Sequence, residues 1–281
     1  MLDPTGLIAG HFECRSWDQT EPVLTDLLSL QISQNALGQR TARHPNSGWS
    51  LIVHEDGPGA PDKPHNNHYG FRVAHKHEIN NAYVFLSDRK EQYGLSRISK
   101  PSSTHFAYSV YLKEPGGNDV EIEWYDIEAA KEGRQNAAAQ WQDELPETTS
   151  VKRGYMPQSM SHGTLGCGDK EQANRFYEQV LGLSIVGGGR VSTYIGHPAG
   201  PWYIVVIPGR KRHTLTRNNR FVLQAPTPDS VEEAHIALGK NGKSLGISAL
   251  DDLAIRDQHA SFLFADPDLN WWEFTSEDVR G

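Results

Sequence analysis

Residues 161–183 read SHGTLGCGDKEQANRFYEQVLGL, a short strand-like run followed at once by a helical pattern. The helical part spaces its apolar residues three and four apart, as the buried stripe of an amphipathic helix requires. These residues are Ala173, Phe176, Tyr177, Val180 and Leu181. A similar pair of segments opens the chain, where GHFECRS (residues 10–16) precedes a helical pattern from residue 17 to about residue 30. The chain therefore repeats a strand–helix unit.

The segments that follow these two units also resemble each other. HNNHYGFRVA (65–74) and NNRFVLQAP (218–226) are strand-like, and each leads into a helical pattern, over about 78–93 and 229–241. SVYLKEPGGNDVEIEW (109–124) and SFLFADPDLNWWEFTS (261–276) each read as two strands joined by a turn rich in Pro, Gly, Asn or Asp. The spacing of equivalent positions agrees as well. His11, His68 and Glu121 are 57 and 53 residues apart, and His162, Arg220 and Glu273 are 58 and 53 apart.

These repeats predict an α+β fold of four βαβββ modules, paired into two domains with curved, barrel-like mixed sheets. We expect the first two modules to form one domain over residues 1–126, which would contain the active site. The polar, Ala- and Gln-rich stretch 127–156 is expected to be a linker, helical over about 127–145. The last two modules would then form a second domain over residues 157–281.

Composition narrows the class of protein. The chain has 281 residues, a formal net charge of −8 and no dense basic stripe, which argues against a nucleic-acid partner. Two distant cysteines give neither a disulfide framework nor a zinc-finger spacing. There is no apolar run of 18 residues and no signal-peptide pattern at the start of the sequence. We therefore expect a cytoplasmic protein that has no membrane partner.

Three of the repeated positions carry residues that bind metals. Two histidines and one carboxylate form the ligand set of non-haem Fe(II) oxygenases. His11, His68 and Glu121 supply this set if all three side chains face the inside of one curved sheet. His65 is a rival ligand, but it precedes the strand. In the second half Arg220 replaces the second histidine, and a guanidinium cannot bind a metal. Arg220 is expected to pair with Glu273 instead, which would leave residues 157–281 free of metal.

Three fragments resemble the vicinal oxygen chelate superfamily, which comprises the glyoxalase, bleomycin resistance and dioxygenase proteins. They are the helix DKEQANRFYEQVLGL and the turns EPGGNDVE and DPDLNWWE. Within the superfamily, the chain is similar to the two-domain type I extradiol dioxygenases. The resemblance implies an Fe(II) enzyme, with Mn(II) as the alternative metal, that opens the ring of a small aromatic diol with O2. It also implies a homo-oligomer. Most such enzymes keep their metal in the C-terminal domain, which is the reverse of the arrangement expected here.

The same resemblance suggests catalytic roles for three residues. Tyr111, ten residues before Glu121, matches a tyrosine that hydrogen-bonds the substrate. His54, fourteen residues before His68, matches a histidine that lies beside bound oxygen. A further acid–base histidine of the family would fall at Ser102, so the nearby His105 is the candidate for that role.

Two other functions remain open. A glyoxalase-like isomerase or lyase would need a fourth ligand or a carboxylate base on the strand of His54. Glu55 adjoins His54 there, but neighbouring strand residues face opposite sides of a sheet. A protein that only binds an aromatic compound or an antibiotic is the third possibility, although a full set of metal ligands argues against it.

Overall fold

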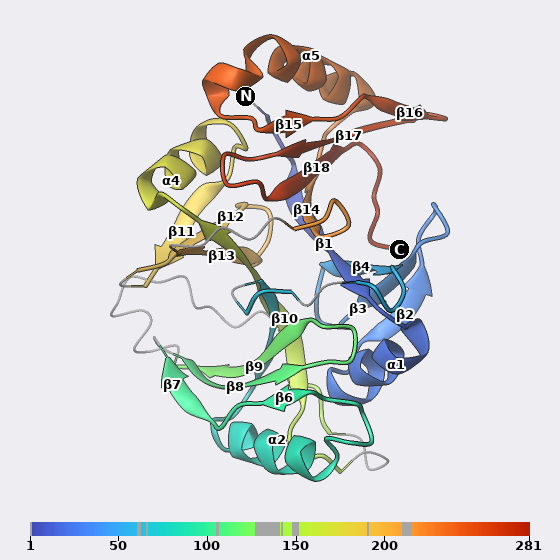
Figure 1. The fold of residues 1–281 in the computed structure, drawn as a ribbon, viewed down its shortest axis with the longest axis vertical. Coiled ribbons are helices and arrows are strands. Elements are labelled where there is room, and N and C mark those ends of the chain that lie inside the picture. Colours follow the sequence, from blue (N-terminus) through green and yellow to red (C-terminus); the bar gives the residue numbers. More distant parts are fainter. Residues whose placement is uncertain are drawn as a thin grey trace.

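The computed structural model describes residues 2–60, 63–65, 67–104, 107–126, 141, 143–147, 152–189, 191–209 and 215–281. It contains four consecutive modules, each with one strand, a helical segment and further strands (Figure 1). This confirms the predicted α+β class and the fourfold repeat. The predicted linker helix over 127–145 lies almost entirely outside the described residues.

The bounds of the elements follow the repeat. Module 1 comprises β1 (Gly6–Cys14), α1 (Trp17–Pro22), the π-helical segment η1 (Val23–Leu27), β2 (Gln31–Gln34), β3 (Arg40–Arg43) and β4 (Ser50–Glu55). Module 2 comprises β5 (His68–Val73), α2 (His77–Asp88), β6 (Arg97–Ile98), β7 (Ser102–Thr104), β8 (Ala107–Lys113) and β9 (Asp119–Tyr125). Module 3 comprises β10 (Pro157–Cys167), α4 (Lys170–Gln179), β11 (Ser184–Gly188), β12 (Thr193–Gly196) and β13 (Tyr203–Pro208). Module 4 comprises β14 (Arg220–Gln224), α5 (Pro228–Leu245), β15 (Ala249–Leu250), β16 (Ala254–Arg256), β17 (His259–Ala265) and β18 (Trp271–Thr275).

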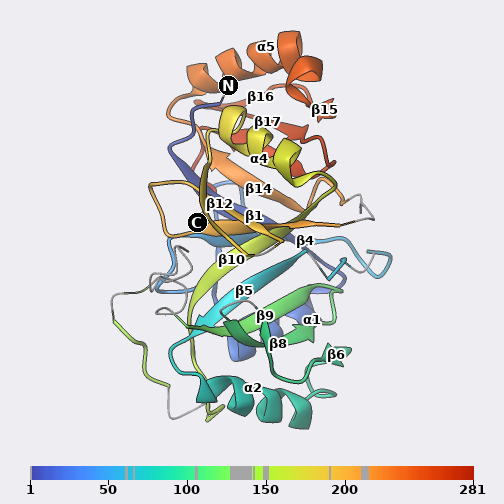
Figure 2. The same cartoon turned by 90° about the vertical axis from the view of Figure 1, so that its left-hand side faces the viewer.

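The strands form two open, mixed, nine-stranded sheets. Sheet A has the order β15-β17-β18-β14-β1-β4-β3-β2, with β16 paired to β17. Sheet B has the order β11-β12-β13-β10-β5-β9-β8-β6, with β7 paired to β8. In both, the first strands of two modules meet antiparallel at the centre, as β1 with β14 and β10 with β5. Helices α5 and α2 lie at opposite ends of the molecule (Figures 1 and 2).

This pairing corrects the expected partnership of the modules. Sheet A joins module 1 to module 4, and sheet B joins module 2 to module 3. The expected domains 1–126 and 157–281 therefore do not each form a separate sheet. Each of the two ranges contributes one module to sheet A and its other module to sheet B. A module can pair its first strand with any other module that offers a matching edge, and sequence spacing does not specify which one.

Local sequence explains the start and end of the helices that lie beside the sheets. Thr227 caps α5 in a reciprocal capping box with Ser230, and Gly246 ends the helix with a φ of 87°. Asp169 caps α4 by accepting a hydrogen bond from the backbone of Gln172. The central strands β1 and β5 are buried along their whole length, although each also contains charged or polar residues. Among the described residues, no helix combines the length and the apolar character that crossing a membrane requires.

Candidate metal centre

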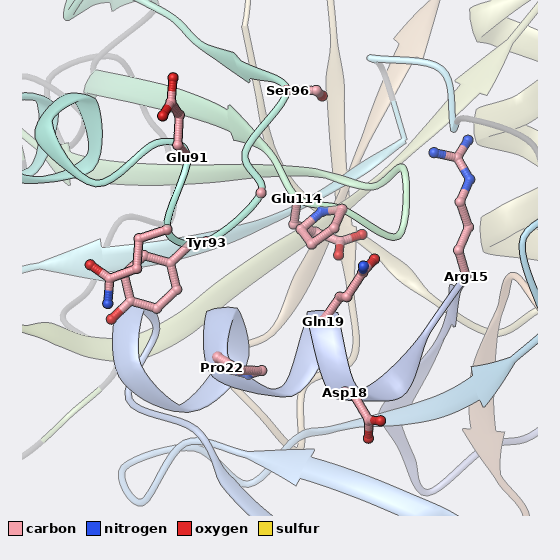
Figure 3. A pocket seen from close by; sticks show the side chains of 11 residues that line it. Arg15, Asp18, Gln19, Pro22, Glu91, Tyr93, Ser96 and Glu114 are labelled. Carbon is pink, nitrogen blue, oxygen red and sulfur yellow. The ribbon is translucent and has the colours of Figure 1, made fainter.

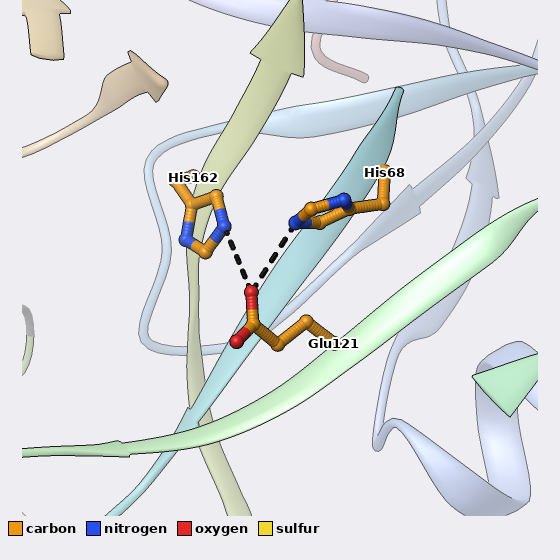
Figure 4. A group of neighbouring side chains, drawn as sticks. All are labelled: His68, Glu121 and His162. Atoms are coloured by element: carbon orange, nitrogen blue, oxygen red, sulfur yellow. Dashed lines mark hydrogen bonds and ion pairs between the residues drawn. The ribbon is translucent and has the colours of Figure 1, made fainter. Parts of the chain in front are cut away.

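One group of ligand-type side chains converges in sheet B. His68 on β5, Glu121 on β9 and His162 on β10 are all buried, and one ligand atom of each lies within 4.8 Å of the others. Figure 4 shows both imidazole rings directed at the same carboxylate oxygen. The Nε2 atoms of His68 and His162 lie 3.2 Å and 3.4 Å from Glu121 Oε2. Atoms that each lie about 2.1 Å from a shared metal ion are about 3.0–3.4 Å apart, so these separations suit a metal centre.

The register of the central strands brings the three ligands together. Strand β9 runs parallel to β5 and places Glu121 beside Gly70, two residues after His68 and on the same face. Strand β10 runs antiparallel to β5 and places His162 beside Gly70 as well. A Cβ atom on residue 70 would lie 2.2 Å from Cε1 of His162. Glycine is therefore required there, because the imidazole ring occupies the space of a side chain.

The hydrogen-bond partner of Nδ1 in His68 indicates which nitrogen of this ring carries the proton and which faces Glu121. Nδ1 of His68 lies 2.8 Å from the carbonyl oxygen of His65, which can only accept, so Nδ1 carries a proton. Nε2 is then the nitrogen that faces the Glu121 carboxylate, at 3.2 Å. A histidine that donates from Nδ1 to a backbone carbonyl and directs Nε2 into the site has the orientation of a metal ligand.

The electrostatic field at the centre favours a positive charge. Burial alone would lower the pKa of His162, but Glu123 and Glu121 outweigh it and raise the pKa to about 9. Burial likewise opposes ionisation of Glu121, yet His162 and His68 hold its pKa well below the ordinary value. A field that stabilises an imidazolium stabilises a metal cation at the same place.

A small cavity of about 70 Å³ adjoins the three ligands. Tyr111 lies opposite Glu121 in the β8–β9 pair, and its ring meets the edge of His68 at a centroid distance of 5.4 Å. Burial and Glu121 both raise the pKa of Tyr111, so the phenol keeps its proton. Val205 and Ile207 of β13 give the cavity an apolar wall. Typical ligand pockets are several times larger, so the space among the described residues admits only the chelating end of a substrate.

Sheet A holds the counterpart of this centre, and it is closed. Arg220 and Glu273 occupy the positions equivalent to His68 and Glu121. The register makes Ala9 the counterpart of His162, and His11 lies two residues further along β1, with its Nε2 3.3 Å from Glu273 Oε2. The guanidinium Nε of Arg220 donates to Glu273 Oε2 at 2.7 Å. The structure thus has the ion pair that the sequence predicts at this place.

Titration in sheet A follows from that ion pair. Arg220 and His11 outweigh burial and lower the pKa of Glu273 to about 2. Burial and Arg220 lower the pKa of His11 to about 3 and that of His54 to about 4. The two histidines are neutral and contact each other, with Nδ1 of His11 2.6 Å from Nε2 of His54. Arg220 thus supplies the positive charge that a metal ion would supply in sheet B.

The structure places the predicted site residues in two groups. It brings His68, Glu121 and Tyr111 together, but His11 and His54 lie in sheet A. The expected ligand set is therefore corrected, since His162 stands where His11 was expected. His105 lies outside the described residues. Residues 157–281 were expected to be free of metal, and His162, which belongs to them, is one of the three side chains of the candidate centre. One signal in the sequence could have identified His162, since Gly70 leaves room for its ring where sheet A has Val222.

Replacing Arg220 with histidine should open the second centre. The Arg220→His variant places a second histidine at the counterpart of His68, next to Glu273 and to His11, which already contacts Glu273. We expect Zn(II) binding to rise from about one to about two ions per chain, because the obstacle in sheet A is the guanidinium. Elemental analysis of dialysed protein measures this stoichiometry. An unchanged stoichiometry would show that more than Arg220 closes sheet A.

A larger pocket of about 490 Å³ lies away from both centres, between α1 and the segments around Tyr93 and Pro115 (Figure 3). Its one deeply buried acid is Glu114. This carboxylate accepts hydrogen bonds from Thr20, from Asn118 and from the backbone of Gly116. Glu114 is therefore fully engaged in holding the turn between β8 and β9, as the structural role of the EPGGND segment requires.

The fold and the site together define a protein of paired βαβββ modules with a candidate two-histidine, one-carboxylate metal centre. Residues 159–274 match the model of the Glyoxalase/Bleomycin resistance protein/Dioxygenase superfamily, so the chain carries a domain of that superfamily. The superfamily includes glyoxalases, bleomycin resistance proteins and dioxygenases. The matched stretch contains His162 but neither His68 nor Glu121, so the likeness in sequence covers only one of the three candidate ligands.

Solved structures share the architecture over nearly the whole chain. The crystal structure of a "putative dioxygenase" from Bacillus subtilis is 13% identical, with a TM-score of 0.60 over 98% of this chain and 86% of that one. Glyoxalase I from Zea mays is 14% identical, with a TM-score of 0.61 over 96% of this chain and 92% of that one. Identities this low show a shared fold alone. No curated protein matches the sequence.

Proposed function

We propose that this chain is a non-haem Fe(II) extradiol dioxygenase, with His68, Glu121 and His162 as its metal ligands. The observation that carries the proposal is the composition of the centre. Two histidines and one carboxylate converge there, while the described wall on β13 presents Val205 and Ile207. Three protein ligands leave positions for a bidentate diol and for O2, as in other enzymes with this ligand set.

The ring-opening reaction needs no added reductant, because both atoms of O2 enter the diol to give a hydroxymuconic semialdehyde-type product. Fe(II), when bound, would supply Lewis acidity toward the diol and the redox partner that dioxygen requires. Tyr111 would donate a hydrogen bond to an oxygen of the substrate, since its phenol is protonated and faces the cavity. Val205, Ile207 and the rings of Tyr194 and Tyr203 would exclude water.

A glyoxalase-like isomerase is the second candidate, because the fold is similar to that of glyoxalase I. Enolisation requires a base near the chelated substrate. Glu123 is the one further carboxylate among the described residues that line the cavity, and it is ion-paired with Arg72. The geometry therefore supports the dioxygenase more strongly.

Oxygen dependence separates the two candidates. We expect anaerobically purified protein loaded with Fe(II) to turn a catechol into a yellow product only after O2 is admitted, with matching oxygen uptake. The Tyr111→Phe variant should lower kcat by about 10- to 1000-fold through the lost hydrogen bond, and His54→Ala is the matched control because it lies in sheet A. Turnover of a chelating substrate without O2 would replace the dioxygenase with the isomerase.

A further inference from the structure

A second carboxylate, that of Glu123, lies beside the three candidate ligands and lines the same cavity. Glu123 follows Glu121 by two residues and shares its face of β9. Glu123 Oε1 accepts hydrogen bonds from Arg72 Nη2 at 3.0 Å and from the Ser161 hydroxyl at 2.7 Å. It also lies 3.5 Å from Nδ1 of His162. Arg72, Glu123 and Ser161 are each at most 2% exposed, so solvent does not screen these contacts.

The direction of these hydrogen bonds determines where the proton of His162 sits. Because the Ser161 hydroxyl donates to Glu123, it presents a lone pair to its other neighbour, Nδ1 of His162, at 3.0 Å. Both acceptors near Nδ1 therefore require a proton on that nitrogen. In the neutral ring, Nε2 is then left with its lone pair toward Glu121, as a metal ligand must be.

Arg72 keeps Glu123 in this role. Its guanidinium bonds Glu123 through Nε and Nη2, and Nη2 also donates to the Tyr203 hydroxyl at 3.0 Å. The Tyr203 ring stacks on His162 with a centroid distance of 5.5 Å and an interplanar angle of 16°. Arg72 thus hydrogen-bonds two groups that contact the His162 ring. One is the Glu123 carboxylate, which lies at the edge of the ring, and the other is the hydroxyl of Tyr203, whose ring stacks on its face.

The closed centre in sheet A provides an internal comparison. Strand register makes Gln224 the counterpart of Arg72 and Thr275 the counterpart of Glu123. His11, two residues along β1 from the counterpart of His162, directs its Nδ1 at Nε2 of His54 rather than at a carboxylate. The buried ion pair therefore accompanies the ligand set of sheet B and is missing from its duplicate, although both sheets have the same architecture.

We propose that Arg72 and Glu123 are positioning residues that fix His162 as the Nδ1–H tautomer and keep Glu123 from the metal ion. This inference rests on the proposed metal site. A second carboxylate so close to the ligands would otherwise be free to fill a position that the substrate needs. The pair thereby increases metal affinity while the number of protein ligands stays at three.

The test transplants the sheet A residues into sheet B as the double variant Arg72→Gln/Glu123→Thr. Removing both charges together avoids an unpaired buried ion, and the same residues are accommodated in sheet A. We expect Zn(II), titrated in competition with a chromophoric chelator, to bind about 10- to 100-fold more weakly. Gln224→Ala, at the matched position of sheet A, is the control and should bind Zn(II) as the unaltered chain does.

A tautomer measurement separates positioning from a general loss of structure. In 15N-histidine spectra of the Zn(II)-loaded protein, His162 should show a protonated, exchange-protected Nδ1, which the double variant should lose. Ser161→Ala keeps both charges and should weaken Zn(II) binding by a smaller factor, which provides a test if the double variant does not fold. Unchanged affinity in the variants, or a His162 bound through Nδ1, would overturn the inference while the metal site stands. Failure of the unaltered chain to bind Zn(II) would overturn both.

Discussion

Replacing His162 with alanine should abolish tight binding of a divalent metal ion. The variant keeps two of the three ligands, His68 and Glu121. One histidine and one carboxylate bind a divalent ion much more weakly than the full set. We expect the dissociation constant for Zn(II) to rise by more than about 100-fold, because even the outer partners of metal ligands contribute 10- to 100-fold. Titration by isothermal calorimetry measures the change, and circular dichroism confirms that the chain remains folded.

The matched control for this experiment is His11→Ala. His11 has the same type of side chain, is also buried and also lies beside a glutamate, but that glutamate is Glu273 of sheet A, which is ion-paired with Arg220. We expect this variant to bind Zn(II) like the unaltered chain. Loss of binding in His11→Ala with retention in His162→Ala would restore the ligand set expected from the sequence and contradict the structure.

The second large effect should come from a single methyl group. Gly70→Ala places a Cβ atom 2.2 Å from Cε1 of His162, which is far inside contact distance. The imidazole must move, and its Nε2 then loses its place beside Glu121. We expect loss of metal binding and a destabilisation of about 1–3 kcal/mol from overpacking. Metal titration and thermal unfolding measure the two effects.

Gly59→Ala is a suitable control, because nothing lies within 4 Å of a Cβ atom at that position. It should change neither metal binding nor the melting temperature appreciably. If Gly70→Ala also bound metal normally, the ring of His162 could not lie over β5 as the structure places it.

Most of the fold could be predicted from the sequence because each module repeats its own local signals. The apolar spacing over 170–181 and the turns at 114–118 and 266–270 identified helices and hairpins that the structure confirms. The partnership of modules could not be predicted in this way. The first strands of all four modules are similar buried runs, and their pairing depends on contacts between edges far apart in the sequence.

Those residues of the candidate site that lie within one module could be predicted from the sequence. His68, Tyr111 and Glu121 lie on strands of module 2, so their spacing and the pleat of the sheet were enough to place them together. The third ligand comes from another module. His11 and His162 both lie on the first strand of a module, but strand pairing places them in different sheets, and the register makes Ala9 the counterpart of His162.

Arg220 illustrates a prediction that needed only chemistry. A guanidinium at a ligand position excludes a metal and attracts the nearby carboxylate, whichever module lies opposite. The ion pair with Glu273 follows from residue types alone. The expected role of His54 could not be settled from residue type, because it depended on which sheet contains β4.

We expect one chain to bind one divalent ion among His68, Glu121 and His162. The most direct measurement is anomalous diffraction at the absorption edge of the metal, from crystals of protein loaded with Zn(II). A single anomalous peak within coordination distance of both Nε2 atoms and the Glu121 carboxylate is the predicted result. A peak beside His11 and Glu273, or no peak at the sheet B ligands, would contradict it.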